Sequence, residues 1–105
     1  MSNEIEVIER AFAAARREAE AYRAKHGEPM YCGFAWVVVR PANSKLAKIL
    51  KERYGASKHH AGGMMVYNPS GLPTQSMDIK EEGAYAFARV LTEAGYRAMA
   101  QSRAD

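Results

Sequence analysis

The protein has 105 residues, of which 48% are hydrophobic and 26% are charged, and its formal net charge is +3. This length suits one domain over residues 1–105, with a radius of gyration of about 13 Å, and leaves no room for a second. The composition excludes a disordered chain.

Three features bear on the compartment. A single cysteine, Cys32, cannot form an internal disulfide, so nothing indicates an oxidising environment. The first residues are acidic and polar, unlike those of a signal or transit peptide. The longest apolar run, residues 33–39, is too short to span a bilayer. We predict a cytoplasmic protein that has no membrane partner.

Residues 4–25 have the periodicity of a long amphipathic helix, within an N-terminal element of residues 1–27. Its apolar stripe consists of Ile5, Ile8, Phe12, Ala15, Ala19 and Tyr22. The stripe packs either on the protein's own sheet or against a second copy, since a repeat of 3.5 residues favours helix-on-helix packing. We predict a homodimer that forms through this first helix.

A strand is predicted over residues 30–40, apolar on both alternating faces, which is typical of a central strand covered on both sides. Cys32 lies in this strand, and we expect it to be buried and unreactive. A second helix follows over about residues 44–54, with Asn43 or Ser44 as its N-cap.

Residues 64–67 are predicted to form another strand after a Gly62-Gly63 turn, and residues 57–60 to add a short hairpin strand before it. A third helix is predicted over about residues 78–94. Asp78 is its expected N-cap, because Glu81 three residues later completes a pair like a capping box.

Gly83 lies on the inner face of that third helix, which suggests a close backbone crossing there. A last strand follows over residues 96–102. Alternating helices and strands favour crossover connections and parallel pairing. We therefore expect a small α/β fold with three helices and a sheet of three to four strands, mostly parallel or, with the hairpin strand, mixed.

The sequence lacks the patterns of common catalytic sites. It has no Gly-x-Ser-x-Gly elbow and no glycine-rich phosphate loop. His59 and His60 are adjacent, so on a strand they point to opposite faces and do not share a metal ion. We predict no catalytic residue, no metal and no cofactor, and we favour a function other than catalysis.

A candidate anion site combines the entry to the third helix with the end of the last strand. Helix N-termini attract negative groups, and ligands of open α/β sheets lie beyond the carboxyl ends of strands. The alternative is that these residues only cap the helix and end the chain. The predicted ligand-binding residues are Lys58, His59, Tyr67, Gln75, Ser76, Arg103 and Asp105.

The excess of positive charge lies in residues 27–60, which hold six basic and two acidic residues. This segment indicates either a solvated helix face or an anionic partner. A nucleic acid is one such partner, although no aromatic residues alternate with the lysines. The basic residues concerned are Lys45, Lys48, Lys51 and Arg53.

Several segments between residues 30 and 105 resemble a group of small phage-encoded proteins of unknown function. They are Cys32-Gly33-Phe34-Ala35-Trp36, Gly62-Gly63, Gln75-Ser76-Met77-Asp78-Ile79-Lys80, Phe87-Ala88-Arg89-Val90-Leu91 and Ser102-Arg103-Ala104-Asp105. The resemblance implies a phage or prophage origin, and hence the host cytoplasm, but no activity.

Our main hypothesis is a binding module for a small anionic ligand, such as a nucleotide or a nucleotide-derived signal that a phage protein would sequester. One alternative is a protein-binding inhibitor of a host enzyme. The other is a weak nucleic-acid binder.

Overall fold

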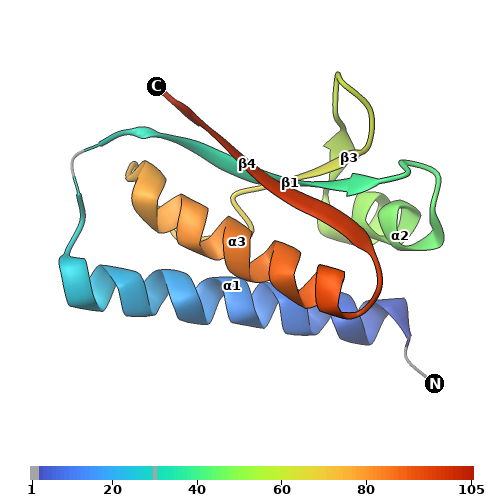
Figure 1. The fold of residues 1–105 in the computed structure, drawn as a ribbon, viewed down its shortest axis with the longest axis horizontal. Helices are drawn as coiled ribbons and strands as arrows, with labels where there is room; N and C mark the ends of the chain where they lie inside the picture. Colours follow the sequence, from blue (N-terminus) through green and yellow to red (C-terminus); the bar gives the residue numbers. More distant parts are fainter. Residues whose placement is uncertain (1–2, 30) are drawn as a thin grey trace.

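The computed structural model of the protein describes residues 3–29 and 31–105 and contains helices and strands in alternation (Figure 1). In chain order they are α1 (Glu4–His26), β1 (Gly33–Arg40), α2 (Lys45–Tyr54), β2 (Ser57–Lys58), β3 (Met64–Tyr67), α3 (Met77–Glu93) and β4 (Arg97–Ala104). All the predicted elements are present. Met30, the predicted first residue of the first strand, lies outside the described residues.

The strands form one antiparallel sheet in the order β2-β3-β1-β4, so the predicted mostly parallel or mixed sheet is wrong. The helical crossover does leave β1 and β2 running in the same direction. However, β3 pairs between them, and β1 in turn separates β3 from β4. Parallel strands are therefore never neighbours, which is the split β-α-β arrangement of ferredoxin-like folds. The predicted hairpin strand is confirmed as β2.

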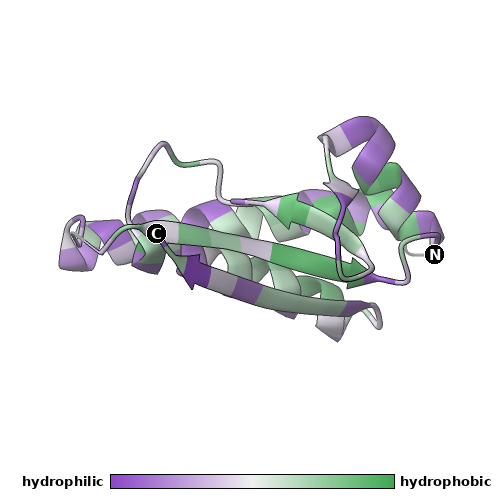
Figure 2. Ribbon diagram, turned by 90° about the horizontal axis from the view of Figure 1, so that it is seen from above, coloured by the Kyte–Doolittle hydropathy of each residue, from purple (hydrophilic) through white to green (hydrophobic). Residues whose placement is uncertain are grey.

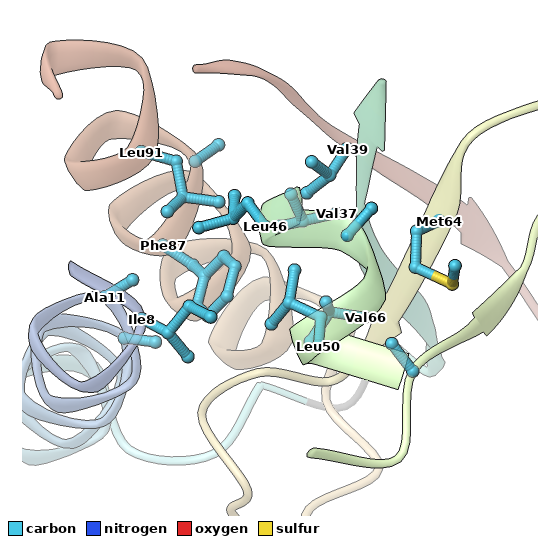
Figure 3. Close-up of a cluster of buried hydrophobic side chains, with 14 of the residues drawn as sticks. Ile8, Ala11, Val37, Val39, Leu46, Leu50, Met64, Val66, Phe87 and Leu91 are labelled. Atoms are coloured by element: carbon cyan, nitrogen blue, oxygen red, sulfur yellow. The ribbon is translucent and has the colours of Figure 1, made fainter. Parts of the chain in front are cut away.

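The hydrophobic core lies between the helices and one face of the sheet. Figure 1 shows α3 between α1 and the strands. Phe87 of α3 is completely buried, and its ring meets that of Phe12 edge to face, 4.8 Å between centroids. Figure 3 shows the same cluster with Val37, Val39, Leu46, Leu50, Met64 and Val66. The alternation of β1 thus buries one row of its side chains beneath α2 and α3.

The apolar stripe of α1 packs on α3 of the same chain. Ile8, Ala15 and Ala19 are completely buried. The expected close crossing at Gly83 is confirmed, because a Cβ atom there would lie 2.8 Å from the Cβ of Ser70 and 3.4 Å from the carbonyl oxygen of Ala15. The apolar stripe of α1 therefore packs on α3 rather than directly on the sheet. Dimerisation through α1 stays a prediction.

Ser76, and not the predicted Asp78, caps the N-terminus of α3. The hydroxyl of Ser76 accepts a hydrogen bond from the backbone N–H of Ile79, at 3.4 Å. A tertiary contact sets this start, because Ser76 forms an isolated β-bridge with Cys32. At α2 the N-cap is Ser44, one of the two predicted candidates. Among the helices described, none combines the length and the hydrophobicity that spanning a bilayer requires.

None of the described helices lies over the second face of the sheet, which is the face that Figure 2 views. The expectation that both faces of β1 are covered is therefore wrong, and Phe34 and Trp36 are only half-buried. Cys32, which we expected to be buried, is exposed. It lies just before β1, where it bridges to Ser76 and its carbonyl oxygen accepts a hydrogen bond from the backbone N–H of Asp105.

Candidate ligand site on the open face of the sheet

Side chains of β1, β3 and β4 share the uncovered face of the sheet. The register pairs Trp36 with Tyr67 and Gln101, and directly opposed residues point to the same side. Every second residue along a strand shares that side. We call this surface the open face; it consists of Phe34, Trp36, Val38 and Arg40 of β1, Met65 and Tyr67 of β3, and Arg97, Met99, Gln101 and Arg103 of β4.

A hollow of about 330 Å³ lies at one end of the open face. Figure 1 shows that the turn between β2 and β3 rises above the strands. The two histidines of this turn, His59 and His60, form one wall of the hollow. We call this site the aromatic hollow; its lining residues are Phe34, Trp36, His59, His60, Met65, Tyr67 and Arg103. Aromatic rings and one guanidinium group therefore dominate its lining.

The rings of the aromatic hollow are held in defined orientations. The indole Nε1 of Trp36 donates a hydrogen bond to Oε1 of Gln101, at 2.9 Å. The Trp36 ring lies within 28° of parallel to that of His59, 6.4 Å between centroids. Tyr67 remains 49% exposed, and its ring centroid is 6.2 Å from that of Phe34. These partly exposed rings offer flat surfaces to a flat ligand.

Lys80 brings a positive charge to the edge of the aromatic hollow. After Tyr67 the chain turns away, which leaves the edge of β1 without a strand partner at Gly33. The ammonium of Lys80 fills this place: Nζ donates a hydrogen bond to the carbonyl oxygen of Gly33, at 2.9 Å, and lies 5.2 Å from the centroid of the Phe34 ring. Lys80 is only 7% exposed, so water screens its charge weakly.

The open face is positive. It carries Arg40, Arg97 and Arg103, and none of its residues is acidic. Within the described part of the chain, no carboxylate lies at ion-pair distance from these three guanidinium groups or from the Lys80 ammonium. Such unpaired cations favour a negatively charged ligand.

Three of the seven predicted ligand-binding residues line the aromatic hollow: His59, Tyr67 and Arg103. Lys58 is not among them. It lies on the other side of β2, where it lines a hollow of about 240 Å³ with Lys48 and Lys51 of α2. The basic segment predicted from the sequence is thus separate from the open face.

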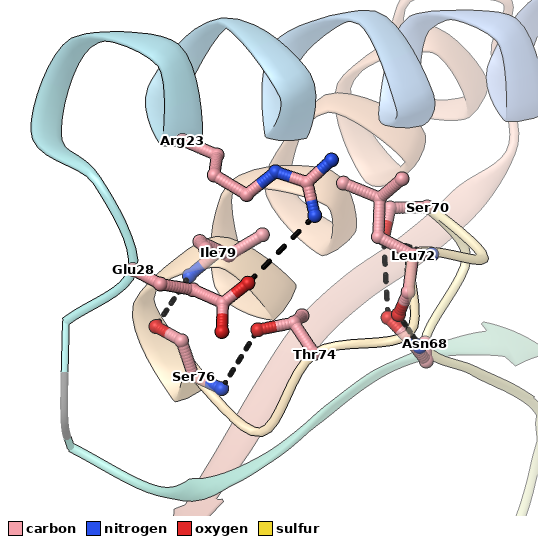
Figure 4. A network of polar contacts seen from close by, with 8 residues as sticks. All are labelled: Arg23, Glu28, Asn68, Ser70, Leu72, Thr74, Ser76 and Ile79. Carbon is pink, nitrogen blue, oxygen red and sulfur yellow. Dashed lines mark hydrogen bonds and ion pairs between the residues drawn. The ribbon is translucent and has the colours of Figure 1, made fainter.

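The other three predicted residues lie on either side of Cys32. On one side, Ser76 forms a β-bridge with Cys32, and Gln75 is the residue before Ser76. On the other side, the backbone N–H of Asp105 donates a hydrogen bond to the carbonyl oxygen of Cys32, at 3.1 Å. The entry to α3 and the chain end are therefore near one another, as expected. However, the Ser76 side chain is engaged in capping its own helix through Ile79 (Figure 4). Ser76 is also only 2% exposed.

Backbone donors at the start of α3 are also engaged within the protein. The N–H of Ser76 donates to Oγ1 of Thr74, and the N–H of Met77 donates to the carbonyl oxygen of Tyr31. Arg23 and Glu28 form an ion pair close by, 3.7 Å apart (Figure 4). The open face, rather than the helix start, is therefore the better candidate for a ligand site.

Sequence reasoning missed Phe34, Trp36, His60 and Met65. A signal for the first two was present, because large aromatic residues separated by one small residue lie on one face of a strand. Among the described residues, no three side chains of His, Cys, Asp or Glu gather in a way that would hold a metal ion.

We compared the chain with models of protein families, with curated proteins and with solved structures. None of these comparisons gave a match. The geometry of the open face is therefore the basis for inferring a function, and the phage origin stays a prediction.

Proposed function

We propose that the protein is a non-enzymatic binding module for nucleotide-type ligands, which it holds in the aromatic hollow. A base would lie against the rings of Trp36 and Tyr67, and its phosphate would meet Arg103. One observation carries this proposal: aromatic rings and the Arg103 guanidinium line one hollow, on a face whose strand residues include no acid. That guanidinium has no carboxylate at ion-pair distance among the residues that the structure describes.

The chemistry of such a ligand matches the two kinds of group in the hollow. Stacking of a base on an aromatic side chain contributes about 1–3 kcal/mol and tolerates any base, because every base has a flat π-surface. A guanidinium group binds phosphate oxygens through paired, charge-assisted hydrogen bonds. A nucleotide-derived signal belongs to this ligand class, and its sequestration is the role that the predicted phage origin suggests.

Titration with AMP, GMP, CMP and UMP tests the proposal. Binding is followed by calorimetry and by the fluorescence of Trp36, which is the only tryptophan. A base stacked on that indole should quench its emission. Tyr67→Ala should lower the affinity about 5- to 150-fold, which corresponds to the stacking energy of one base.

Matched variants separate the hollow from the rest of the surface. Tyr85 of α3 is 48% exposed, close to the 49% of Tyr67, so Tyr85→Ala removes an equally exposed ring elsewhere. Arg103→Gln removes the proposed phosphate partner and should also lower the affinity. Arg89→Gln, which removes an exposed guanidinium group of α3, is its control. Absence of heat and of quenching with all four nucleotides would contradict the proposal, as would equal losses in the test and control variants.

A further inference from the structure

The open face is positively charged at both ends. Arg103 borders the aromatic hollow, whereas Arg97 lies six residues away on the same side of β4. At about 3.4 Å per residue, the two positions are about 20 Å apart. The exposed side chain of Met99, at 58%, lies between them together with Gln101.

The far end consists of two opposed arginines. Arg40 of β1 and Arg97 of β4 are direct partners in the register, and like charges directly opposite each other destabilise a sheet. No carboxylate of the described residues lies at ion-pair distance from either. A hollow of about 260 Å³ adjoins them, lined also by Tyr96 and Thr92. An anion at this place would relieve the repulsion.

We infer that the open face binds single-stranded nucleic acid, whose backbone extends from the aromatic hollow to the Arg40–Arg97 pair. This inference rests on the proposed function and names its ligand. A mononucleotide cannot occupy both ends, because its single phosphate group reaches only one of two cationic positions about 20 Å apart. A strand of several nucleotides supplies a phosphate for each end and bases for the rings between them.

Two further points define the nucleic acid as single-stranded and give its direction across the open face. In a duplex the bases are stacked inside, so their faces are not available to Trp36 and Tyr67, whereas unpaired bases are. Asp105 lies two residues beyond Arg103, at the Cys32 end of the sheet, so a nucleic acid that continued past Arg103 on that side would meet a carboxylate. The nucleic acid therefore extends from the aromatic hollow toward Arg97 rather than past Asp105.

The test compares uridine monophosphate with uridine oligomers of two, four and eight nucleotides, at several salt concentrations. We expect the affinity to increase at least tenfold from the monomer to the octamer. Arg97→Gln should weaken octamer binding about 2- to 5-fold, as for an exposed ion pair, and reduce the slope of log affinity against log salt by about 0.7. It should also raise the melting temperature, because it removes the repulsion with Arg40.

Lys48→Gln is the control, because Lys48 belongs to the separate lysine surface beside Lys58. It should leave octamer binding unchanged. The inference is overturned if affinity does not increase with length, if Lys48→Gln rather than Arg97→Gln weakens binding, or if an eight-base-pair duplex or poly-glutamate binds as tightly as the octamer. Mononucleotide binding that depends on Tyr67 would then still support the proposed function. Binding of the octamer without measurable binding of the monomer would support a single-stranded nucleic acid as the ligand but not the binding of mononucleotides.

Discussion

Gly63 holds the turn of the β2–β3 hairpin against the open face, and its replacement by alanine should destabilise the protein. Its φ of +91° is in the region that disfavours other residues. A Cβ atom would lie 2.5 Å from Cγ1 of Val38 and 3.0 Å from Cγ of Arg40. Gly62 has a similar φ of +95°, but a Cβ atom there meets nothing within 4 Å. Gly62→Ala is therefore a control that contains the backbone strain without the clash.

The expected magnitudes differ between the two variants. Backbone strain costs each about 1–3 kcal/mol. Gly63→Ala adds an overpacking cost of about 1–3 kcal/mol, because Val38 is buried and has little room to move. Each kcal/mol lowers the melting temperature of a domain of this size by about 4–8 °C.

Urea unfolding, followed by Trp36 fluorescence and by circular dichroism, gives the free energy of unfolding of both variants. Gly63→Ala should be less stable than Gly62→Ala by about 1–3 kcal/mol, with unchanged m-values. It should also displace the histidine wall of the aromatic hollow and weaken nucleotide binding. Equal stabilities would refute the reasoning, because they would mean that the hairpin does not pack on Val38.

Three other substitutions test the fold. Phe87→Ala should cost about 3–5 kcal/mol, measured by urea unfolding, because the completely buried ring leaves a cavity; a cost below about 1 kcal/mol would contradict this packing. Ser76→Ala should lower the free energy of unfolding by about 1 kcal/mol, and Asp78→Ala by clearly less; the reverse order would restore Asp78 as the cap. The hydrogen bond to Glu9, with burial, raises the pKa of Tyr54 above its ordinary 10.0, so the folded state favours the protonated phenol. The contribution of this phenol to the free energy of unfolding is therefore complete below about pH 10, and it is lost as the pH rises through the raised pKa of Tyr54. Urea unfolding at about pH 9 and pH 11 should show this loss, and Tyr54→Phe should reduce it; an equal loss in the variant would argue against the contact.

Periodicity predicted the helices well, because α1 and α3 bury wide apolar stripes. Sheet direction was not predictable in the same way. The direction depends on β2, which spans only Ser57–Lys58 and carries no recognisable pattern. It also depends on the position of β3, which pairs between β1 and β2, the two strands that precede it in the sequence. The cap of α3 was misassigned for a similar reason, since the bridge between Cys32 and Ser76 is a contact between distant segments.

The candidate site was predicted in part. The sequence predicts His59, Tyr67 and Arg103 as ligand residues, but it assigns them to a site at the helix start. Phe34 and Trp36 were interpreted as signs that β1 is covered on both faces, because an uncovered strand face usually carries polar residues. Large apolar side chains on both faces of a strand therefore have two explanations, a second covering layer or an exposed aromatic surface, and tertiary structure decides between them.

The order of strands in the sheet has a consequence for how the aromatic hollow is assembled. Phe34 and Arg103 are direct partners in the sheet although 69 positions separate them along the chain. The site is therefore complete only when β4 is docked onto β1. A ligand that needs both residues binds the completed fold and not the unfolded chain, so it should raise the stability of the whole domain, by about 2.7 kcal/mol at a concentration one hundred times its dissociation constant.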